Sequence, residues 1–350
     1  MTRLPTAFAS ALVAATFLAP AAWAQDSCAN RGQLDTLYCD ANNDLVADTP
    51  ADPAKQRDPS TLVFAWSPTE NPAVYKAVYE PIMAHLQSCT GKRIAFFNVQ
   101  SNSAQIEAQR AGRMHVALYA TGAIGFAVNM AGGVPFVGMG NAQGVGGYQV
   151  YAIVKADSPY QKLADLKGKK VAHVSPTSNS GNLAPRVFFA EQGLKPDEDY
   201  KPVMSGGHDK SILGVNLGDY DGAAVASDIF DRMSARGQVK AEAFRILWKS
   251  QVFPTTGFVM SHDLKPELQK KITDCMVSYK FSDELKKEYA GMDRFLPISY
   301  KDTWKPIREV AERSGTPYNR AGYEAQVKRD AEAAAKRAAE AASKPAAAKP

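Results

Sequence analysis

The most informative stretch of the sequence is a turn of small polar residues, Ser178-Asn179-Ser180-Gly181, between a β-prone run and an apolar-periodic helix. Pro185 falls in the first turn of that helix, where proline is well tolerated. The first N–H groups of a helix have no partner inside the helix, and the helix dipole is positive at this end. With short hydroxyl and amide side chains beside them, these groups predict a site for a small oxyanion that needs no cationic side chain. The alternative interpretation is a plain N-cap, which serine and asparagine also favour.

A second segment of the same kind follows about thirty residues later. The strand-like run 201–205 leads into Gly206-Gly207-His208, and a helix-like run from Asp209 is stopped by Gly218. Two helix N-termini that face one cleft would make a binding pocket. His208 could donate a hydrogen bond to the anion, or a full positive charge, because an adjacent dianion raises the pKa of an imidazole. Taken alone, a histidine after two glycines is more often a cap or a surface residue.

Three further candidates lie at the ends of predicted strands. Tyr119 could donate its hydroxyl to a ligand, and the alternative is an aromatic plug under the sheet. Thr69 is a weaker donor, and its neighbour Glu70 suits the start of a helix. A carboxylate such as Asp228 repels an anion unless the ligand brings a proton or an amine, so it favours a protonated oxyanion over sulfate. The alternative role of Asp228 is an N-cap.

The sequence does not match the common catalytic motifs. Ser180 is not part of a Gly-x-Ser-x-Gly elbow, and there is no glycine loop followed by Lys-Ser/Thr for a nucleotide. None of the five histidines pair at metal-ligand spacing, and His115 lies in a strand-like run, which favours a structural role. We therefore expect a binding protein rather than an enzyme, without a resident cofactor.

The elements that must position these residues alternate between β-prone and helical runs from Thr61 onward. Strands that alternate with helices imply βαβ units and an α/β fold with mainly parallel sheets. Two runs, 62–66 and 223–226, are apolar throughout, as a sheet covered on both faces requires. The chain passes from one predicted lobe to the other near residues 145–155 and returns near residues 250–258, which predicts a two-segment hinge between the lobes. We expect lobe 1 to comprise residues 61–147 and 256–325, and lobe 2 residues 148–255.

The chain has 350 residues, of which 45% are hydrophobic, enough for one large domain or two lobes. Residues 1–24 read as a secretory signal, with Arg3, an apolar run and a small-x-small cleavage site at Ala22-Trp23-Ala24. No later apolar run approaches the roughly 20 residues that cross a bilayer. We therefore expect an exported, soluble protein. The net charge of +5 is modest and does not indicate nucleic-acid binding.

Four cysteines in an exported chain favour two disulfides. The simplest of the three connectivities joins Cys28 to Cys39 and Cys89 to Cys275. The first bond closes a short N-terminal loop, and the second ties the first third of the chain to the last third. A metal site is the competing use, but the spacing fits no zinc pattern.

Two polar segments flank the predicted lobes. Residues 25–60 contain Asp40, Asn42, Asp44 and Asp48, whose spacing is that of a calcium loop. Leu45 and Ala51 replace the glycine and the glutamate of an EF-hand, so we favour a solvated linker over a structural calcium ion. Residues 326–350 are rich in Ala, Lys and Glu, with high helix propensity but no wide apolar stripe. We expect them to form a flexible tail.

The order of several motifs resembles the phosphonate, phosphite and phosphate substrate-binding proteins of ABC importers, over roughly residues 60–290. The resemblance implies a class II periplasmic binding-protein fold, with two lobes that close on a tetrahedral phosphorus oxyanion. It also implies that the serine-rich turn, a histidine and a tyrosine contact the ligand. The motifs are Ser67-Pro-Thr-Glu70, Val116-Ala-Leu-Tyr119, Ser175-Pro-Thr-Ser-Asn-Ser-Gly181, Gly207-His208 and Ser227-Asp228.

Carried over by position, the resemblance assigns ligand contacts to the turn residues Thr177, Ser178, Asn179 and Ser180, although the family often has threonine where this chain has Asn179. Aminophosphonate binders of the family carry a further acidic residue near the returning segment, where this chain has Thr255-Thr256, and this disfavours an amine-bearing ligand.

The function implied by the resemblance is that of a monomeric periplasmic solute-binding protein that serves an ABC permease in the inner membrane. Two alternatives remain at this point. The same lobes could report a ligand to a membrane receptor, or the chain could be an exported hydrolase.

Overall fold

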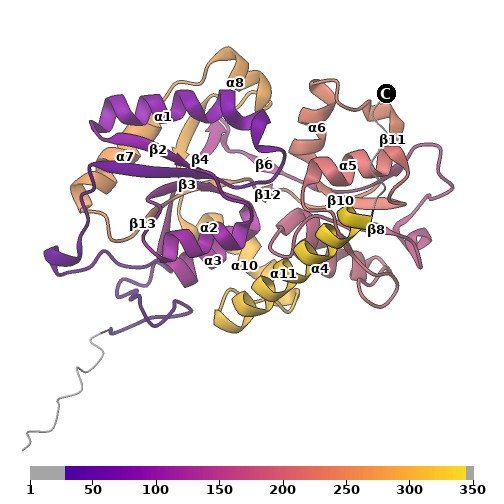
Figure 1. The fold of residues 1–350 in the computed structure, drawn as a ribbon, viewed down its shortest axis with the longest axis horizontal. Helices are drawn as coiled ribbons and strands as arrows, with labels where there is room; N and C mark the ends of the chain where they lie inside the picture. The colour runs from indigo at the N-terminus through magenta and orange to yellow at the C-terminus, as the bar shows by residue number, and fades with distance from the viewer. Residues whose placement is uncertain (1–27, 344–350) are drawn as a thin grey trace, which may run out of the picture.

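The computed structural model describes residues 28–343, so the predicted signal at 1–24 lies outside the described residues. Two β-sheets, each flanked by helices, form two lobes that lie side by side (Figure 1). None of the helices within residues 28–343 has the length and apolar character of a membrane span.

The sheet of the first lobe has seven strands. Strands β1, β2 and β3 pair in parallel, and β13 returns antiparallel between β3 and β4. In the order in which they pair, the strands are β14 (Arg294–Pro297), β4 (Gly133–Asn141), β13 (Gly257–Ser261), β3 (Val116–Tyr119), β1 (Thr61–Trp66) and β2 (Arg93–Phe97), with the short β5 (Gly144–Val145) on β4.

Helices cover both faces of this sheet (Figure 1). Leu62 and Phe64 of β1 belong to the core cluster under α1 and α7, whereas Ala65 belongs to the cluster that contains α2 and α3. Because each face is covered, the apolar run of β1 has no solvent side, as its sequence predicted. The helices of this lobe are α1 (Lys76–Thr90), α2 (Asn102–Arg110), α3 (Thr121–Ala131), α7 (Pro266–Ser278), α8 (Asp283–Glu288), α9 (Tyr300–Thr303) and α10 (Lys305–Arg313).

The second lobe is built on a five-stranded sheet. The parallel trio β9, β8 and β10 is extended by β7 and β11, which pair antiparallel. In the order in which they pair, the strands are β11 (Phe244–Lys249), β7 (Val150–Lys155), β10 (Gly222–Ala226), β8 (Val171–His173) and β9 (Val203–Met204). Its main helices are α4 (Ala184–Glu191), α5 (His208–Leu217) and α6 (Ser227–Ala235).

Two chain segments cross between the lobes, and they pair with each other. Strand β6 (Gly147–Tyr148) is antiparallel to β12 (Phe253–Pro254), so the outgoing and returning segments run side by side. The predicted two-lobed α/β fold with a two-segment connection is confirmed. After the second crossing, β13 re-enters the first sheet antiparallel to both β3 and β4.

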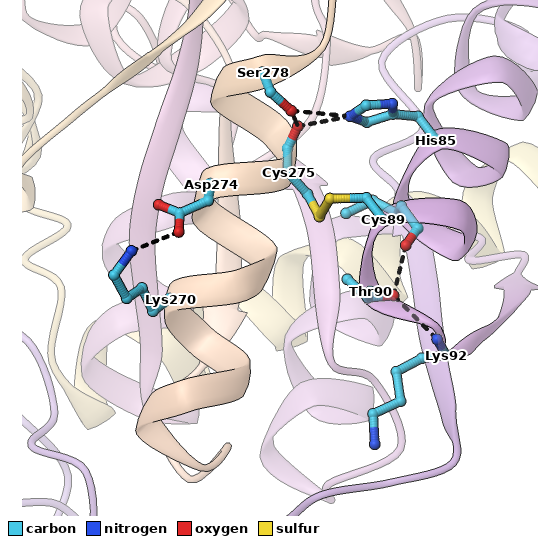
Figure 2. The surroundings of a disulfide bond; sticks show 9 residues. His85, Cys89, Thr90, Lys92, Lys270, Asp274, Cys275 and Ser278 are labelled. Atoms are coloured by element: carbon cyan, nitrogen blue, oxygen red, sulfur yellow. Dashed lines mark hydrogen bonds and ion pairs between the residues drawn. A yellow bond between two sulfur atoms is a disulfide. The ribbon is translucent and has the colours of Figure 1, made fainter.

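Both predicted disulfides are present. Cys28 pairs with Cys39, with their Cα atoms 5.4 Å apart, and Cys89 pairs with Cys275, with theirs 5.9 Å apart. Figure 2 shows how the second bond joins the last turn of α1 to α7, beside a hydrogen bond of 2.8 Å between His85 Nε2 and the carbonyl oxygen of Cys275. The bond therefore fixes two helices that are 186 residues apart in sequence on the same face of the first lobe.

In the acidic N-terminal loop, residues 40–48, the carboxylates accept hydrogen bonds from the backbone of the loop itself. Asp40 accepts the N–H groups of Asp44 and Leu45, and Asp48 accepts that of Ala41. The side chain of Asn42 hydrogen-bonds Asp44. In residues 28–343 no group of three or more His, Cys, Asp or Glu side chains is arranged to hold a metal. The preference for a solvated linker over a calcium ion stays a prediction, and the bonds observed here suit a purely structural loop.

The flexible tail predicted for residues 326–350 is helical in the structure as far as Ser343. Helix α11 runs over Arg320–Ser343, and residues 344–350 lie outside the described part. Tyr323 and Gln326 are buried, and the Tyr323 hydroxyl donates to Glu107 of α2 at 2.7 Å. The helix thus docks through the buried ring of Tyr323, which packs on Phe126, and through a few polar contacts, rather than through a wide apolar stripe.

Candidate functional site

A small cavity with a mixed polar and apolar lining lies between the lobes, with a volume of about 60 Å³. Both lobes and both crossing segments contribute to it. The first lobe supplies Trp66, Thr69, Tyr75, Asn102, Thr121 and Tyr289; the second supplies Ser175, Ser178, Asn179, Ser180, His208, Asp228, Ile229 and Arg232; the crossings supply Tyr148, Thr255 and Thr256.

The serine-rich turn opens into a single π-helical turn, η4 (Asn179–Leu183), which continues directly into α4. Ser178 is its N-cap, and the Ser178 Oγ accepts the N–H of Gly181 at 3.0 Å. The N–H groups of Asn179 and Ser180 make no hydrogen bond to any other described residue. These two donors lie at the positive end of the helix, so this end has the geometry of an anion site.

Asn179 also connects the turn to the first crossing segment. Its Nδ2 donates to the hydroxyl of Tyr148 at 2.8 Å. Burial raises the pKa of Tyr148 to about 12, so this hydroxyl keeps its proton and can donate to a ligand. Sequence reasoning missed Tyr148. The signal available was its position after Gly146-Gly147, at a predicted crossing between the lobes.

His208 begins helix α5 and is buried in the cavity wall. Its Nδ1 accepts the backbone N–H of Ala226 at 3.2 Å. An imidazole that accepts at Nδ1 carries its proton on Nε2, and this leaves Nε2–H as a donor for a ligand. Burial lowers the pKa of His208 to about 4. In this structure His208 is therefore a neutral hydrogen-bond donor at neutral pH, rather than a cation.

Asp228 lies in the first turn of α6 with its two oxygens in different surroundings. Oδ2 faces Nη1 of Arg232 at 3.2 Å and the hydroxyl of Thr255 at 3.5 Å. Oδ1 is buried and makes no hydrogen bond to the described residues. A buried carboxylate oxygen without a donor is costly, so this atom favours a ligand that carries a hydrogen-bond donor.

Arg232 and Glu70 join the two lobes beside the cavity. Nη2 of Arg232 lies 3.1 Å from Oε1 of Glu70, and Nη1 of Arg236 lies 3.1 Å from Oε2 of the same carboxylate. Burial alone would raise the pKa of Glu70, but the two arginines and the Tyr75 hydroxyl hold it below its usual value. Both partners are therefore ionised, and the contacts between them hold the lobes in a closed arrangement.

Six of the eight residues that the sequence analysis assigned to the ligand lie around this one cavity: Ser178, Asn179, Ser180, His208, Asp228 and Thr69. Their ligand contacts stay predictions. Thr177 is a correction: it is fully buried outside the wall, and its hydroxyl accepts from Asn102 Nδ2 at 2.8 Å. Tyr119 is also a correction: its buried hydroxyl donates to Gln109 Oε1 at 2.6 Å, away from the cavity, so it is the aromatic plug of the alternative interpretation.

A two-lobed α/β fold whose lobes are joined by two paired crossing segments and enclose a small cavity is typical of solute-binding proteins. Comparison with known families shows to which family of solute-binding proteins the chain belongs. The family described as the periplasmic substrate-binding protein of phosphonate ABC transporters matches residues 64–304, more than half of the chain. The chain belongs to this family, and its function is that of the substrate-binding component of an ABC transporter.

The chain is similar to the phosphate-import protein PhnD of Mycolicibacterium smegmatis, with 28% identity over 65% of this chain and 74% of that protein. It is also 26% identical to the phosphonates-binding periplasmic protein of Escherichia coli, over 73% and 74% of the two chains. Among solved structures, a binding-protein component of a Pseudomonas aeruginosa ABC phosphonate transporter superposes with a TM-score of 0.66 at 24% identity, covering 81% of this chain and 99% of that one. This last likeness confirms the fold.

Proposed function

We propose that the protein captures a phosphorus oxyanion, of the phosphonate, phosphite or phosphate type, between its lobes in the periplasm and delivers it to an ABC permease. The observation that carries the proposal is the convergence of two helix N-termini, those of η4 and α5, with Ser178, Ser180 and His208 around one cavity. The relatives named for phosphate import and phosphonate binding support the same ligand class.

In this proposal, neutral hydrogen-bond donors rather than cations bind the negatively charged ligand. Arg232 is the one arginine or lysine in the cavity wall among the described residues, and its guanidinium nitrogens face carboxylates. Backbone N–H groups, hydroxyls and the neutral His208 must therefore provide the affinity, in a cavity from which closure removes water. Such donors are effective without net charge because they are fixed in place before the ligand arrives.

Asp228 favours phosphorus over sulfur. Its unpartnered Oδ1 accepts a proton-bearing group, which monohydrogen phosphate, hydrogen phosphite and monoprotonated phosphonates supply. Sulfate is fully deprotonated at neutral pH and would place bare oxygens against this carboxylate.

The proposed location rests on the predicted export signal and on two disulfides, which persist in oxidising compartments such as the periplasm. Delivery to a permease predicts that deletion of the gene abolishes uptake of the ligand, with no turnover of the ligand by the purified protein.

The direct test is calorimetric titration of the purified protein with phosphate, phosphite, methylphosphonate and sulfate. We expect one-site saturable binding of at least one phosphorus compound, and affinity for sulfate lower by at least about 100-fold, since an unpaired buried acceptor costs about 1–3 kcal/mol and like-charge repulsion adds to it. Binding of sulfate alone, or of none of the four, would contradict the proposal.

A further inference from the structure

Arg232 is an immobilised cation in the wall of the cavity. Its side chain is 9% exposed, and its Nη1, Nη2 and Nε face Asp228, Glu70 and Glu288 at 3.2, 3.1 and 3.5 Å. The guanidinium also lies over the ring of Tyr289, 5.1 Å from its centroid. Because carboxylates from both lobes and an aromatic ring surround it, the closed protein holds this group in one position.

This position changes what Asp228 offers to a ligand. Arg232 occupies Oδ2 and offsets the carboxylate charge, so only Oδ1 faces the cavity without a partner. One P–OH group satisfies Oδ1. An alkylammonium group brings three donors, whereas Oδ1 is the single oxygen of Asp228 without a partner. It also places a second cation beside the guanidinium, which adds to the cost of burying its charge.

The size of the cavity acts in the same direction. Its volume is about 60 Å³, so the cavity is small. Trp66 and Ile229 contribute an apolar part of the wall, against which a methyl group can pack. A longer chain that ends in an amine would bring its charge against this apolar part of the wall, where a charge is poorly solvated.

We propose that Arg232 is a specificity-determining residue, which restricts the site to small phosphoryl compounds without an ammonium group, such as phosphite, phosphate and methylphosphonate, and excludes aminoalkyl phosphonates. This inference rests on the proposed function, because it concerns the ligand of the same cavity. All of these compounds share the phosphoryl group, so the backbone donors at the start of η4 cannot distinguish them. The proposal assigns that discrimination to Arg232, a side chain of the second lobe.

The first test uses the unaltered protein and three ligands in calorimetric titration. Methylphosphonate and n-propylphosphonate differ in size, whereas n-propylphosphonate and 2-aminoethylphosphonate match in size and differ in charge. We expect methylphosphonate to bind tightest, and n-propylphosphonate to bind at least about tenfold more tightly than 2-aminoethylphosphonate. Equal or tighter binding of the amine would overturn the proposal without the need for any variant.

The second test compares Arg232→Met with Arg236→Met. Both substitutions remove a cation that pairs with Glu70 and Glu288, but Arg236 is not part of the cavity wall. We expect Arg232→Met to shift the ratio of the two affinities toward the amine by at least about tenfold, and Arg236→Met to leave the ratio unchanged. The same ratio in both variants, shifted or not, would refute a specific role for Arg232. Failure of the folded wild-type protein to bind any phosphorus compound would instead refute the proposed function.

Discussion

His208 illustrates how the fold selects one chemical form of a residue. The sequence allowed either a neutral donor or a cation at this position. In the structure, Nδ1 of His208 is committed to the N–H of Ala226, and burial lowers the pKa of the imidazole to about 4. The single role left is donation from Nε2, which does not depend on the protonation of the ring near neutral pH.

We expect His208→Ala to weaken binding of the phosphorus ligand at least about tenfold, since one hydrogen bond to a charged group contributes about 1.5–3 kcal/mol. His208→Gln, whose side-chain amide nitrogen can take the position of Nε2, should recover part of the loss. Isothermal titration of the two variants beside the wild type measures both effects. An unchanged dissociation constant for His208→Ala would remove this residue from the site.

The cavity residues that could be predicted from the sequence are those with a local signal. Ser178, Asn179 and Ser180 follow a strand and open a helix, and His208 follows two glycines. Arg232 reaches the same cavity from the second turn of α6, and nothing in its neighbours marks it. Tyr148 reaches it from the first crossing segment, where the preceding Gly146-Gly147 is the one local signal. Tyr119 carried a local signal, at the end of a strand, but its side chain points to the opposite face.

At the scale of elements, helix α3 of the first lobe lies directly against the serine-rich turn 177–180 of the second. A Cβ on Gly122 would lie 2.1 Å from the carbonyl oxygen of Thr177 and 2.7 Å from the amide nitrogen of Asn179. Both of these are backbone atoms, which cannot move aside as a flexible side chain can. Glycine at position 122 therefore permits the close approach of the lobes.

We expect Gly122→Ala to prevent full closure and to lower ligand affinity at least about tenfold, whereas the stability of the ligand-free protein changes by no more than about 1 kcal/mol, because the open form relieves the clash. Gly125→Ala on the same helix is the matched control. Its Cβ would lie 2.2 Å from the ring of Tyr318 within the first lobe, so it should lower stability instead. Titration and denaturant unfolding of both variants separate the two outcomes, and equal affinity of Gly122→Ala and wild type would contradict the account.

At the scale of the whole molecule, the two disulfides constrain very different lengths of chain. Cys89–Cys275 closes a loop of 186 residues and joins α1 to α7, whereas Cys28–Cys39 closes a loop of 11 within the N-terminal segment (Figure 2 shows the former). In the chain-entropy model the longer loop contributes about 5 kcal/mol and the shorter about 3 kcal/mol.

We expect replacement of Cys89 and Cys275 by alanine to lower the free energy of unfolding more than replacement of Cys28 and Cys39. Neither pair lines the cavity, so both double variants should bind ligand with the affinity of the wild type while folded. Chemical denaturation followed by circular dichroism measures the first effect, and titration the second. A larger loss from the short loop would show that loop length does not govern the difference.

The overall architecture was largely predictable because the alternation of strands and helices is a local property of the chain. The pairing of β13 between β3 and β4 was not, since it joins residues that are far apart in sequence. The same reason explains α11, whose burial depends on partners in α2 such as Glu107 and Ser103.

A structure of the protein in complex with methylphosphonate tests the central claim most directly. We predict that the phosphoryl oxygens lie within about 3 Å of the amide nitrogens of Asn179 and Ser180 and of Nε2 of His208, between two closed lobes. A phosphoryl group bound outside this cavity, or bound inside it without contact to these three donors, would contradict the account.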